Sequence, residues 1–381
     1  MYDFQFEPCQ LPDDTKALRA EVREFLKENL EGFPAVKKAA TWQGFDSEFT
    51  RKLGERGWIG MTWPKKYGGH ERSALDRYVV LEEMLAAGAP VAAHWIGDRQ
   101  TGPLLLRYGT EEQRQEFMPA IARGEGYYCI GMSEPDSGSD LASMRTKAER
   151  VDGGWIINGS KLWTTHAHRC NQMVALIRTN PDPDSKHTGL SQFLLNMDIE
   201  GIDPRPIRDL SGSEHFNEVV FKDVYVPTER LVGEEGQGWQ QVMAELAFER
   251  SGPERYLSSF LLLRELVREV KPSDGTARRL VGRCIAHMAT LRLMSLSVAG
   301  MLNEGKAPAL EASVVKDLGT SFEQELPELV HDLLGIEPDP DGDTDLAQVL
   351  SYLTQVAPSF SLRGGTREIL RGIIARGLGL R

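Results

Sequence analysis

The chain has 381 residues, a length that predicts two or three domains, each large enough to bury its own core. Hydrophobic residues make up 41% and charged residues 26%, which is typical of globular proteins and excludes a disordered or fibrous chain. The 44 Lys and Arg residues against 56 Asp and Glu give a net charge of −12, which argues against nucleic acid or an anionic membrane surface as the main partner.

The cysteines predict neither a zinc site nor a disulfide framework. Cys9, Cys129, Cys170 and Cys284 show no C-x-x-C spacing and have no histidines at metal-ligand intervals, so no metal is expected. The first residues lack a basic segment followed by an apolar run, and no stretch approaches 18 consecutive apolar residues. We therefore expect a cytoplasmic protein with reduced thiols and no membrane span.

The first two thirds of the chain change from a helical to a β pattern. Between residues 13 and 123, apolar residues recur at helical spacing, with breaks at Gly32–Pro34 and Trp63–Pro64. From residue 124 to 230, short β-branched and aromatic runs alternate with Gly, Asn, Asp and Pro, which predicts strands. Asp152–Gly154 lies between two of these runs and is predicted to form a hairpin turn, where a positive φ is needed.

Helical patterns return from Gly236 onward. They are predicted over residues 242–270, 276–302, 310–334 and 345–356, with a last segment ending at Leu380. The chain is thus predicted to be an α+β multidomain protein with an N-terminal helical domain (1–123), a middle β domain (124–232) and a C-terminal helical domain (233–381). No βαβ alternation is present, so a doubly wound nucleotide-binding sheet is not expected.

Three segments approach known motifs but depart from them. Gly233–Gly238 has the order G-x-x-G-x-G instead of G-x-G-x-x-G, so a turn before a helix is predicted there. Gly131–Pro135 ends in a proline where a nucleophile elbow needs its second glycine. His166–Cys170 contains two histidines and a cysteine without a fourth ligand, and its histidines are predicted to be loop or surface residues.

The segments most informative for function are Ile130–Leu141 and Ile157–Thr165. The first supplies hydroxyls and exposed backbone N–H groups that suit the edge of a heteroaromatic ring or a phosphate. The second places Trp163, a flat apolar wall, close to the hydroxyl of Thr165. An isoalloxazine ring needs such a wall and such donors, although a buried Trp and a serine-rich turn are also ordinary parts of a core and a loop.

Further motifs stand in a fixed order along the chain. They are Gly57–Gly60, Trp63–Gly69, Tyr108–Gln113, Pro119–Glu125, S-E-P-x-x-G-S-D from Ser133 to Asp140, N-G-x-K-x-W-x-T from Asn158 to Thr165, Gly364–Ile369 and Ile374–Gly379. With them the chain resembles the acyl-CoA dehydrogenase family over nearly its whole length. The resemblance implies an N-terminal helical domain, a middle β-barrel domain and a C-terminal four-helix bundle, with FAD held where the last two meet.

The resemblance also implies roles for single residues. Met132 and Ser133 correspond to residues at the flavin ring, and Trp163 and Thr165 to the pair packed against it. The remaining implied contacts are Ser139 near the cofactor phosphates and the CoA thioester, Thr366, Glu368 and Arg279 at FAD, and Arg250, Gly364 and Gly365 at the substrate. The flavin would carry the redox chemistry, while the protein orients the reactants.

The implied reaction is the removal of the α-proton of an acyl-CoA with transfer of the β-hydride to the flavin, which yields a trans-2-enoyl thioester. Many family members carry the base, a Glu, directly before the Gly-Thr of the last segment, where this chain has Gly364. A minority place it before an Arg on the first long helix of the last domain, and Glu249 stands there, next to Arg250. We therefore predict Glu249 as the base; Glu245, one turn away, is the residue to exclude. The alternative interpretation is that Glu245 and Glu249 are both solvent-exposed charges on a helix, which is the usual environment of Glu.

Two departures bear on partners and substrate. The Arg and Phe that often contact a neighbouring subunit's FAD are missing from the corresponding stretch, Glu269–Gly275. Arg278 or Arg279, which follow this stretch, is the candidate substitute. The related Gln-x-x-Gly-Gly element is reduced to Asp332–Ile336. A homotetramer or a mixed oligomer with a related subunit is expected, with electron-transfer flavoprotein as electron acceptor. Gly364 widens the predicted pocket for a branched or bulky acyl group.

Two alternatives to this activity stay open. One is a flavin oxidase or monooxygenase on the same scaffold, and the other is a non-catalytic subunit of a mixed oligomer.

Overall fold

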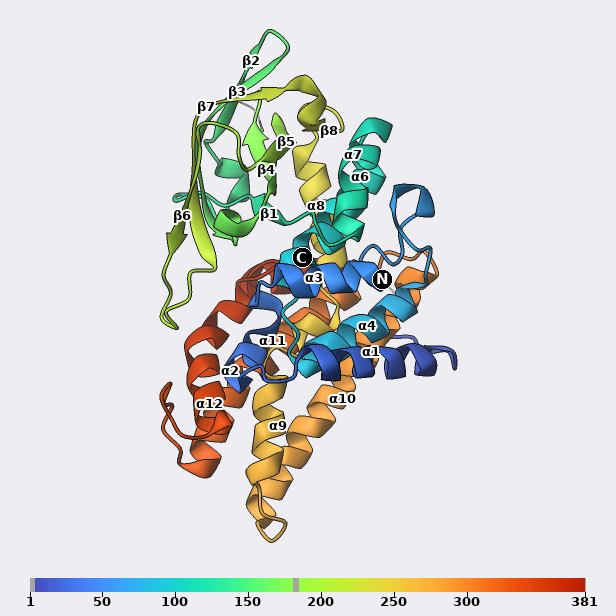
Figure 1. Cartoon of the computed structure of the whole chain (residues 1–381), viewed down its shortest axis with the longest axis vertical. Helices are drawn as coiled ribbons and strands as arrows, with labels where there is room; N and C mark the ends of the chain where they lie inside the picture. The colour runs from blue at the N-terminus through green and yellow to red at the C-terminus, as the bar shows by residue number, and fades with distance from the viewer. Residues whose placement is uncertain (1–3, 181–184, 381) are drawn as a thin grey trace. The chain divides into compact units, whose positions relative to one another are not determined.

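The computed structural model describes residues 4–180 and 185–380, with the backbone alone for residues 245–249. The chain forms two compact units. The helical unit consists of Met1–Gly44, Arg72–Val91 and Ala247–Arg381, and the sheet unit consists of Phe45–Glu71 and Ala92–Leu246. Residues of the N-terminal segment 1–123 therefore contribute to both units. The predicted order of helical, sheet and helical segments along the chain is confirmed (Figure 1).

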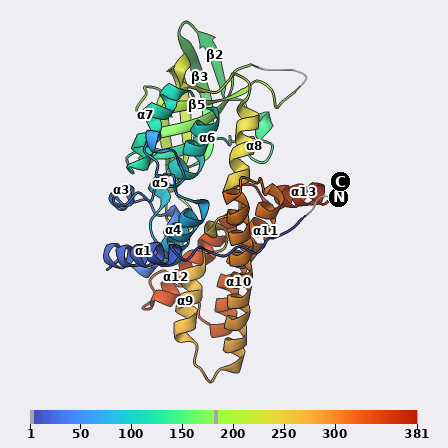
Figure 2. The ribbon, with the colours of Figure 1, turned by 90° about the vertical axis from the view of Figure 1, so that its right-hand side faces the viewer.

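Helices make up the helical unit. They are α1 (Thr15–Asn29), α2 (Ala35–Ala40), α4 (Ala74–Ala87), α9 (Phe260–Glu269), α10 (Gly275–Asn303), α11 (Ala309–Leu334), α12 (Asp345–Val356) and α13 (Arg367–Gly377). Ser73 and Asp76 begin α4 with a reciprocal capping box, and the Asp274 side chain caps α10. Helices α9 to α12 pack against one another, with α9 and α10 running side by side in Figure 2.

The single helix predicted over residues 242–270 is wrong. Helix α8 (Gly238–Glu249) ends at Glu249, a short 3₁₀ turn covers Pro253–Arg255, and α9 begins only at Phe260. The break follows from Gly252 and Pro253, because proline has no N–H to donate and disfavours the helical conformation of the residue before it.

Helix α10 presents an apolar face that the rest of the helical unit covers only in part. By length and composition it is the one helix among the described residues that could cross a membrane, a test that core helices of soluble proteins also pass, and 33% of its apolar window is buried. The side chains of Ile285 and Leu293 are 52% and 62% exposed. Burying such a face against another surface would be favourable.

The sheet unit is built around an eight-stranded sheet in the order β6-β7-β3-β2-β4-β5-β8, with β1 paired to β4. The strands are β1 (Tyr128–Gly131), β2 (Lys147–Val151), β3 (Gly154–Thr165), β4 (Gln172–Arg178), β5 (Leu190–Asn196), β6 (Ile202–Ile207), β7 (Phe216–Pro227) and β8 (Leu231–Val232). The hairpin predicted at Asp152–Gly154 is confirmed: β2 and β3 pair in antiparallel fashion, and Gly153 has a φ of 73°. Trp155 and Phe193 lie edge to face in the core.

The predicted closed barrel is wrong, because the sheet is open. Among the described residues, β6 pairs only with β7 and β8 only with β5, so the two end strands do not meet. Pro204 and Pro206 in β6 cannot donate to a further strand, and β8 is two residues long, so both strands are suited to an edge.

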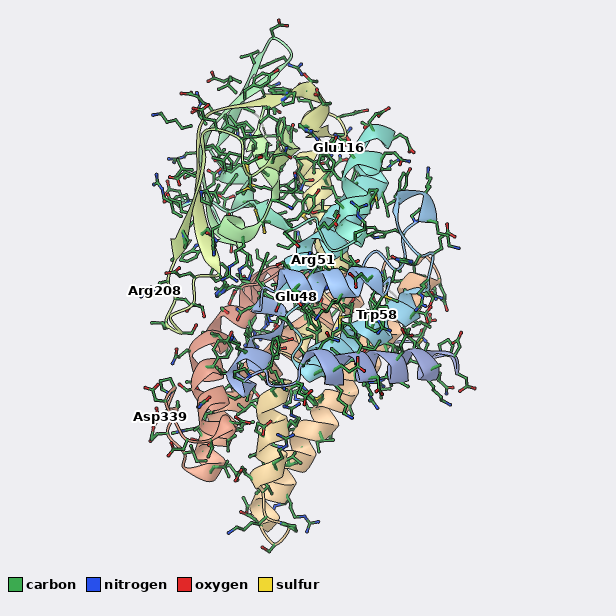
Figure 3. The ribbon with its side chains drawn as sticks, in the orientation of Figure 1. Glu48, Arg51, Trp58, Glu116, Arg208 and Asp339 are labelled. Carbon is green, nitrogen blue, oxygen red and sulfur yellow. The ribbon has the colours of Figure 1, made fainter. Side chains whose placement is uncertain are left out.

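Helices from the N-terminal segment belong to the sheet unit as well. They are α3 (Ser47–Glu55), α5 (Ala92–Ile96), α6 (Gly102–Tyr108) and α7 (Glu111–Ala122). The Gln113 side chain donates to the Glu229 and Leu231 carbonyls at 2.7 and 2.8 Å, and Arg230 pairs with Glu116, labelled on α7 in Figure 3, at 2.8 Å. These contacts attach α7 to the chain around β8.

Candidate active site

The candidate site residues of the sheet unit lie around an irregularity in β3. Lys161 pairs with Val219 of β7 but Thr164 pairs with Asn217, so β3 holds one extra residue there, a β-bulge. Within the bulge, Trp163 has a φ of 60° and its side chain is 55% exposed. A bulky residue at positive φ is a rare conformation that tends to occur at functional sites. The bulge therefore presents the indole of Trp163 outward instead of burying it.

Met132 and Ser133 follow β1 and are bonded to β3 through their carbonyl groups. Lys161 Nζ donates to the Met132 carbonyl at 3.1 Å, and the Leu162 N–H, which the bulge releases from β7, donates to the Ser133 carbonyl at 2.8 Å. Among the described residues, the Ser133 N–H and the Ser133 and Thr165 hydroxyls have no hydrogen-bond partner. Unused donors beside an exposed indole fit the edge and face of a flavin ring.

Ser139 and His166 border this region. Ser139 is exposed on the turn that precedes Asp140. His166 is buried, with 6% of its surface exposed, and its N–H donates to the His215 carbonyl at 2.6 Å. The prediction of His166 as a loop or surface residue is thus wrong as to exposure, because the 3₁₀ turn that it begins packs its ring against Phe45. No three His, Cys, Asp or Glu side chains in the described part of the chain are arranged to hold a metal ion.

The candidate site residues of the helical unit centre on two adjacent glycines before α13. Gly364 and Gly365 have φ values of 62° and 103°, which favour glycine. Arg250, which is 5% exposed, donates from Nε to the Gly364 carbonyl at 3.1 Å, and the fully buried Lys316 donates to the Gly365 carbonyl at 2.6 Å. Two buried cations therefore hold this loop through its backbone.

The other residues predicted for the helical unit lie at helix ends. Thr366 caps α13 by accepting from the Ile369 N–H at 3.5 Å, and Glu368 is exposed in the first turn. Arg279 is exposed near the start of α10 and donates to the Thr276 hydroxyl at 3.2 Å. Glu249 is the last residue of α8; its side chain and that of Glu245 lie outside the described part of the structure.

The structure thus brings Met132 and Ser133 together with β3 in the sheet unit, and Arg250 together with both glycines in the helical unit. The sequence analysis missed Lys316. It included Lys161 and Glu134 in two motifs but gave neither residue a role of its own. A signal for Lys161 and Glu134 was available: the two motifs that border the proposed ring contain one positively and one negatively charged residue that could pair. No local pattern singled out Lys316, since helical Lys residues are usually exposed.

Comparison with known proteins identifies the class of protein. The profiles of the acyl-CoA dehydrogenase N-terminal, middle and C-terminal domains match residues 12–125, 129–224 and 236–379. Acyl-CoA dehydrogenase IpdE1 of Mycobacterium tuberculosis is 34% identical over 389 residues, covering 96% of this chain and 98% of that protein. Acyl-CoA dehydrogenase FadE26 of the same organism is 30% identical over 383 residues, covering 94% of each.

Solved structures agree with the sequence comparison. The Tcur3481-Tcur3483 steroid ACAD has a TM-score of 0.88 at 29% identity, covering 97% of this chain and 98% of that one. The ChsE4-ChsE5 complex from Mycobacterium tuberculosis has a TM-score of 0.85 at 30% identity, covering 98% and 100%. The fold and these matches define a flavin-dependent oxidoreductase.

The chain belongs to the acyl-CoA dehydrogenase family. Its cofactor is FAD, and its activity is the α,β-dehydrogenation of an acyl-CoA thioester to a trans-2-enoyl-CoA. The predictions of family, cofactor and activity are therefore confirmed, and the comparisons do not favour an oxidase or monooxygenase.

Proposed function

We propose that Glu249 is the catalytic base of this dehydrogenase and that the acyl group is bulky or branched. The observation that carries the proposal is the hydrogen bond from Arg250 to the Gly364 carbonyl. It ties the residue next to Glu249 to the position that holds the base in many relatives and that has no side chain here. A carboxylate arriving from α8 can then replace the missing one.

In the proposed step, the Glu249 carboxylate takes the proton from the carbon next to the thioester carbonyl. The bound flavin supplies the acceptor for the hydride that leaves the β-carbon, and a C=C bond forms between the two carbons. Arg250 and Lys316 hold the Gly364–Gly365 backbone through its carbonyl groups. General-base assistance of this kind contributes about 10²- to 10⁴-fold in rate.

The proposal of a bulky acyl group is supported by the two glycines and by the relatives. Gly364 and Gly365 present backbone where a side chain would otherwise occupy space. One structural relative is described as a steroid ACAD. We propose a ring-bearing or branched acyl-CoA as substrate; a panel of acyl-CoAs that reduce the flavin would test this, and fastest turnover of unbranched medium-chain thioesters would contradict it.

The base is tested by comparing Glu249→Gln with the matched variant Glu245→Gln. Under anaerobic conditions, an acyl-CoA should bleach the flavin of the wild type and of Glu245→Gln, with slow reoxidation in air. Glu249→Gln should keep its FAD and lose about 10²- to 10⁴-fold of the bleaching rate. Equal losses in both variants would contradict the assignment, and rapid reoxidation of the wild type in air would point to an oxidase.

We propose that the chain forms a mixed oligomer with a related subunit, which covers the exposed apolar face of α10. Ile285 and Leu293 lie on this face, and one relative's structure is described as a complex of two different chains. We also propose electron-transfer flavoprotein as electron acceptor and a cytoplasmic location, which suits the four free cysteines. Native mass spectrometry of the chain, alone and co-expressed with a related acyl-CoA dehydrogenase subunit, distinguishes a homotetramer from a mixed oligomer.

A further inference from the structure

A buried ion pair lies beneath the loop that carries Met132 and Ser133. Lys161 Nζ and Glu134 Oε1 are 2.8 Å apart, the Lys161 side chain is fully buried, and 8% of Glu134 is exposed. A buried charge is costly unless a partner and hydrogen bonds compensate it. The Glu134 carboxylate also accepts from the backbone N–H groups of Arg145 and Thr146, at 2.6 and 2.9 Å. The pair is therefore well satisfied, and its position is closely defined.

Strand β3 holds three consecutive residues of the loop. Lys161 bonds to the Met132 carbonyl at 3.1 Å and to Glu134, while the Leu162 N–H bonds to the Ser133 carbonyl. Trp163 and Thr165 follow immediately on the same strand. Movement of the Lys161 side chain would thus shift the loop relative to the indole of Trp163, without removing a group assigned to the cofactor.

We propose that Lys161 and Glu134 are positioning residues of the flavin site, whose ion pair sets the spacing between the Met132–Ser133 backbone and the Trp163–Thr165 stretch of β3. The inference rests on the proposed placement of the flavin ring between these two elements. It assigns a function to two residues that do not themselves contact the ring. Small displacements of groups around a reacting centre are costly, up to about 10²-fold in rate for a shift near 1 Å.

The inference can also be tested by varying the pH, because the charge of the ion pair changes with pH. The charged groups facing Lys161 are Glu134 on the loop and Arg178 on β4. Burial lowers the pKa of Lys161 to about 8, and Arg178 adds to this effect while Glu134 opposes it. Burial acts to raise the pKa of Glu134, but Lys161 and the hydrogen bonds to the carboxylate outweigh it and hold this pKa below its ordinary value. Both groups are therefore charged at neutral pH, and Lys161 loses its proton as the pH rises through about 8.

The experiment compares Lys161→Met and Glu134→Gln with the wild-type holoenzyme. Both variants should bind FAD about tenfold or more weakly, shift the flavin absorption bands and slow reduction of the bound flavin by up to about 10²-fold. The double variant should be little worse than Lys161→Met alone, because the two residues act as one unit. The wild-type spectrum should change near pH 8, and this change should be absent in Lys161→Met.

A matched control separates positioning from general destabilisation. Ile177→Ala opens a cavity in the hydrophobic core of the sheet unit and should lower the melting temperature, but leave the spectrum and the reduction rate per bound flavin unchanged. If Lys161→Met does not fold, Glu134→Gln decides, because it keeps an acceptor oxygen in place. Wild-type FAD affinity, spectrum and reduction rate in the folded variants would overturn the inference.

Two further variants distinguish failure of this inference from failure of the flavin placement. Ser133→Ala and Trp163→Phe alter groups assigned to the ring itself, and both should change FAD affinity or the flavin spectrum. If they do so while Lys161→Met and Glu134→Gln do not, the positioning role is overturned and the placement stands. If Ser133→Ala and Trp163→Phe also leave the flavin unchanged, both are overturned.

Discussion

The candidate site residues of the two units are held in opposite ways. In the sheet unit, side chains of two sequence motifs bond directly to each other, so that Lys161 and Leu162 hold Met132, Ser133 and Glu134. In the helical unit, Gly364 and Gly365 have no side chains, and Arg250 and Lys316 hold their backbone carbonyls. Under the proposed function, the sheet unit, which keeps its motifs, contacts the flavin ring, and the helical unit, which departs from the family pattern at Gly364, supplies the base and admits the acyl group.

This contrast predicts that variants of Glu249 and of the Gly364–Gly365 loop leave FAD bound and alter turnover, whereas variants around β3 alter FAD binding. After Glu249→Gln, the largest effect in the helical unit is expected for Glu249→Asp. Shortening the side chain by one methylene moves the carboxylate away from the α-carbon, which should cost about 10²-fold in the rate of flavin reduction. Stopped-flow absorbance measures that rate, and Glu245→Asp is the control. Loss of FAD from Glu249→Asp would contradict the contrast.

A smaller effect is expected for Lys316→Met. The partly buried Gly365 carbonyl would lose the donor that the fully buried Lys316 supplies, which should lower the free energy of unfolding by about 1–3 kcal/mol. Urea denaturation measures the change. Lys306→Met removes a Lys whose ion pairs with Glu7 and Glu304 are exposed, and it should barely change stability. Equal stabilities of the two variants would show that the loop does not depend on the buried cation.

Gly364→Ala should cost about 1–2 kcal/mol, since a side chain is unfavourable at a φ of 62°. Gly335→Ala is the matched control because Gly335 has the same φ, with open space around its missing Cβ. Both variants should lose similar stability in urea denaturation, but only Gly364→Ala should shift the preference towards smaller acyl groups in a flavin-bleaching assay. An unchanged preference would remove Gly364 as a wall of the pocket.

The smallest effect concerns His215, whose carbonyl accepts from His166 in the sheet unit. Burial lowers the pKa of His215 below its ordinary value of 6.5, with Asp209 opposing the shift. Below pH 6.5 the unfolded chain therefore binds more protons at this residue than the folded one, and stability falls as the pH falls. Between pH 7.5 and about 5.5, the free energy of unfolding should fall by less for His215→Gln than for the wild type, and the two falls should differ by about 1 kcal/mol or less. Melting temperatures of both proteins at the two pH values reveal this difference. The same pH dependence in both proteins would exclude the effect.

Sequence reasoning reached the elements whose causes are local. The hairpin at Asp152–Gly154 follows from turn residues next to each other, and the order of helical and β segments follows from hydrophobic spacing. The break before α9 also had a local signal, Gly252–Pro253, which the helical periodicity around it obscured. The family motifs identified the activity because each lies within a few residues of chain.

Only the tertiary structure decided the features that depend on residues distant in sequence. The sheet does not close because β6 and β8 do not meet, which no property of either strand alone determines. Lys161 and Glu134 are 27 residues apart, and Lys316 lies 49 residues from Gly365, yet each pair is in hydrogen-bond contact. Hydrophobic periodicity records which face of an element is buried, but the partner of a buried charge is set by how the elements pack, so these contacts became visible only in the folded chain.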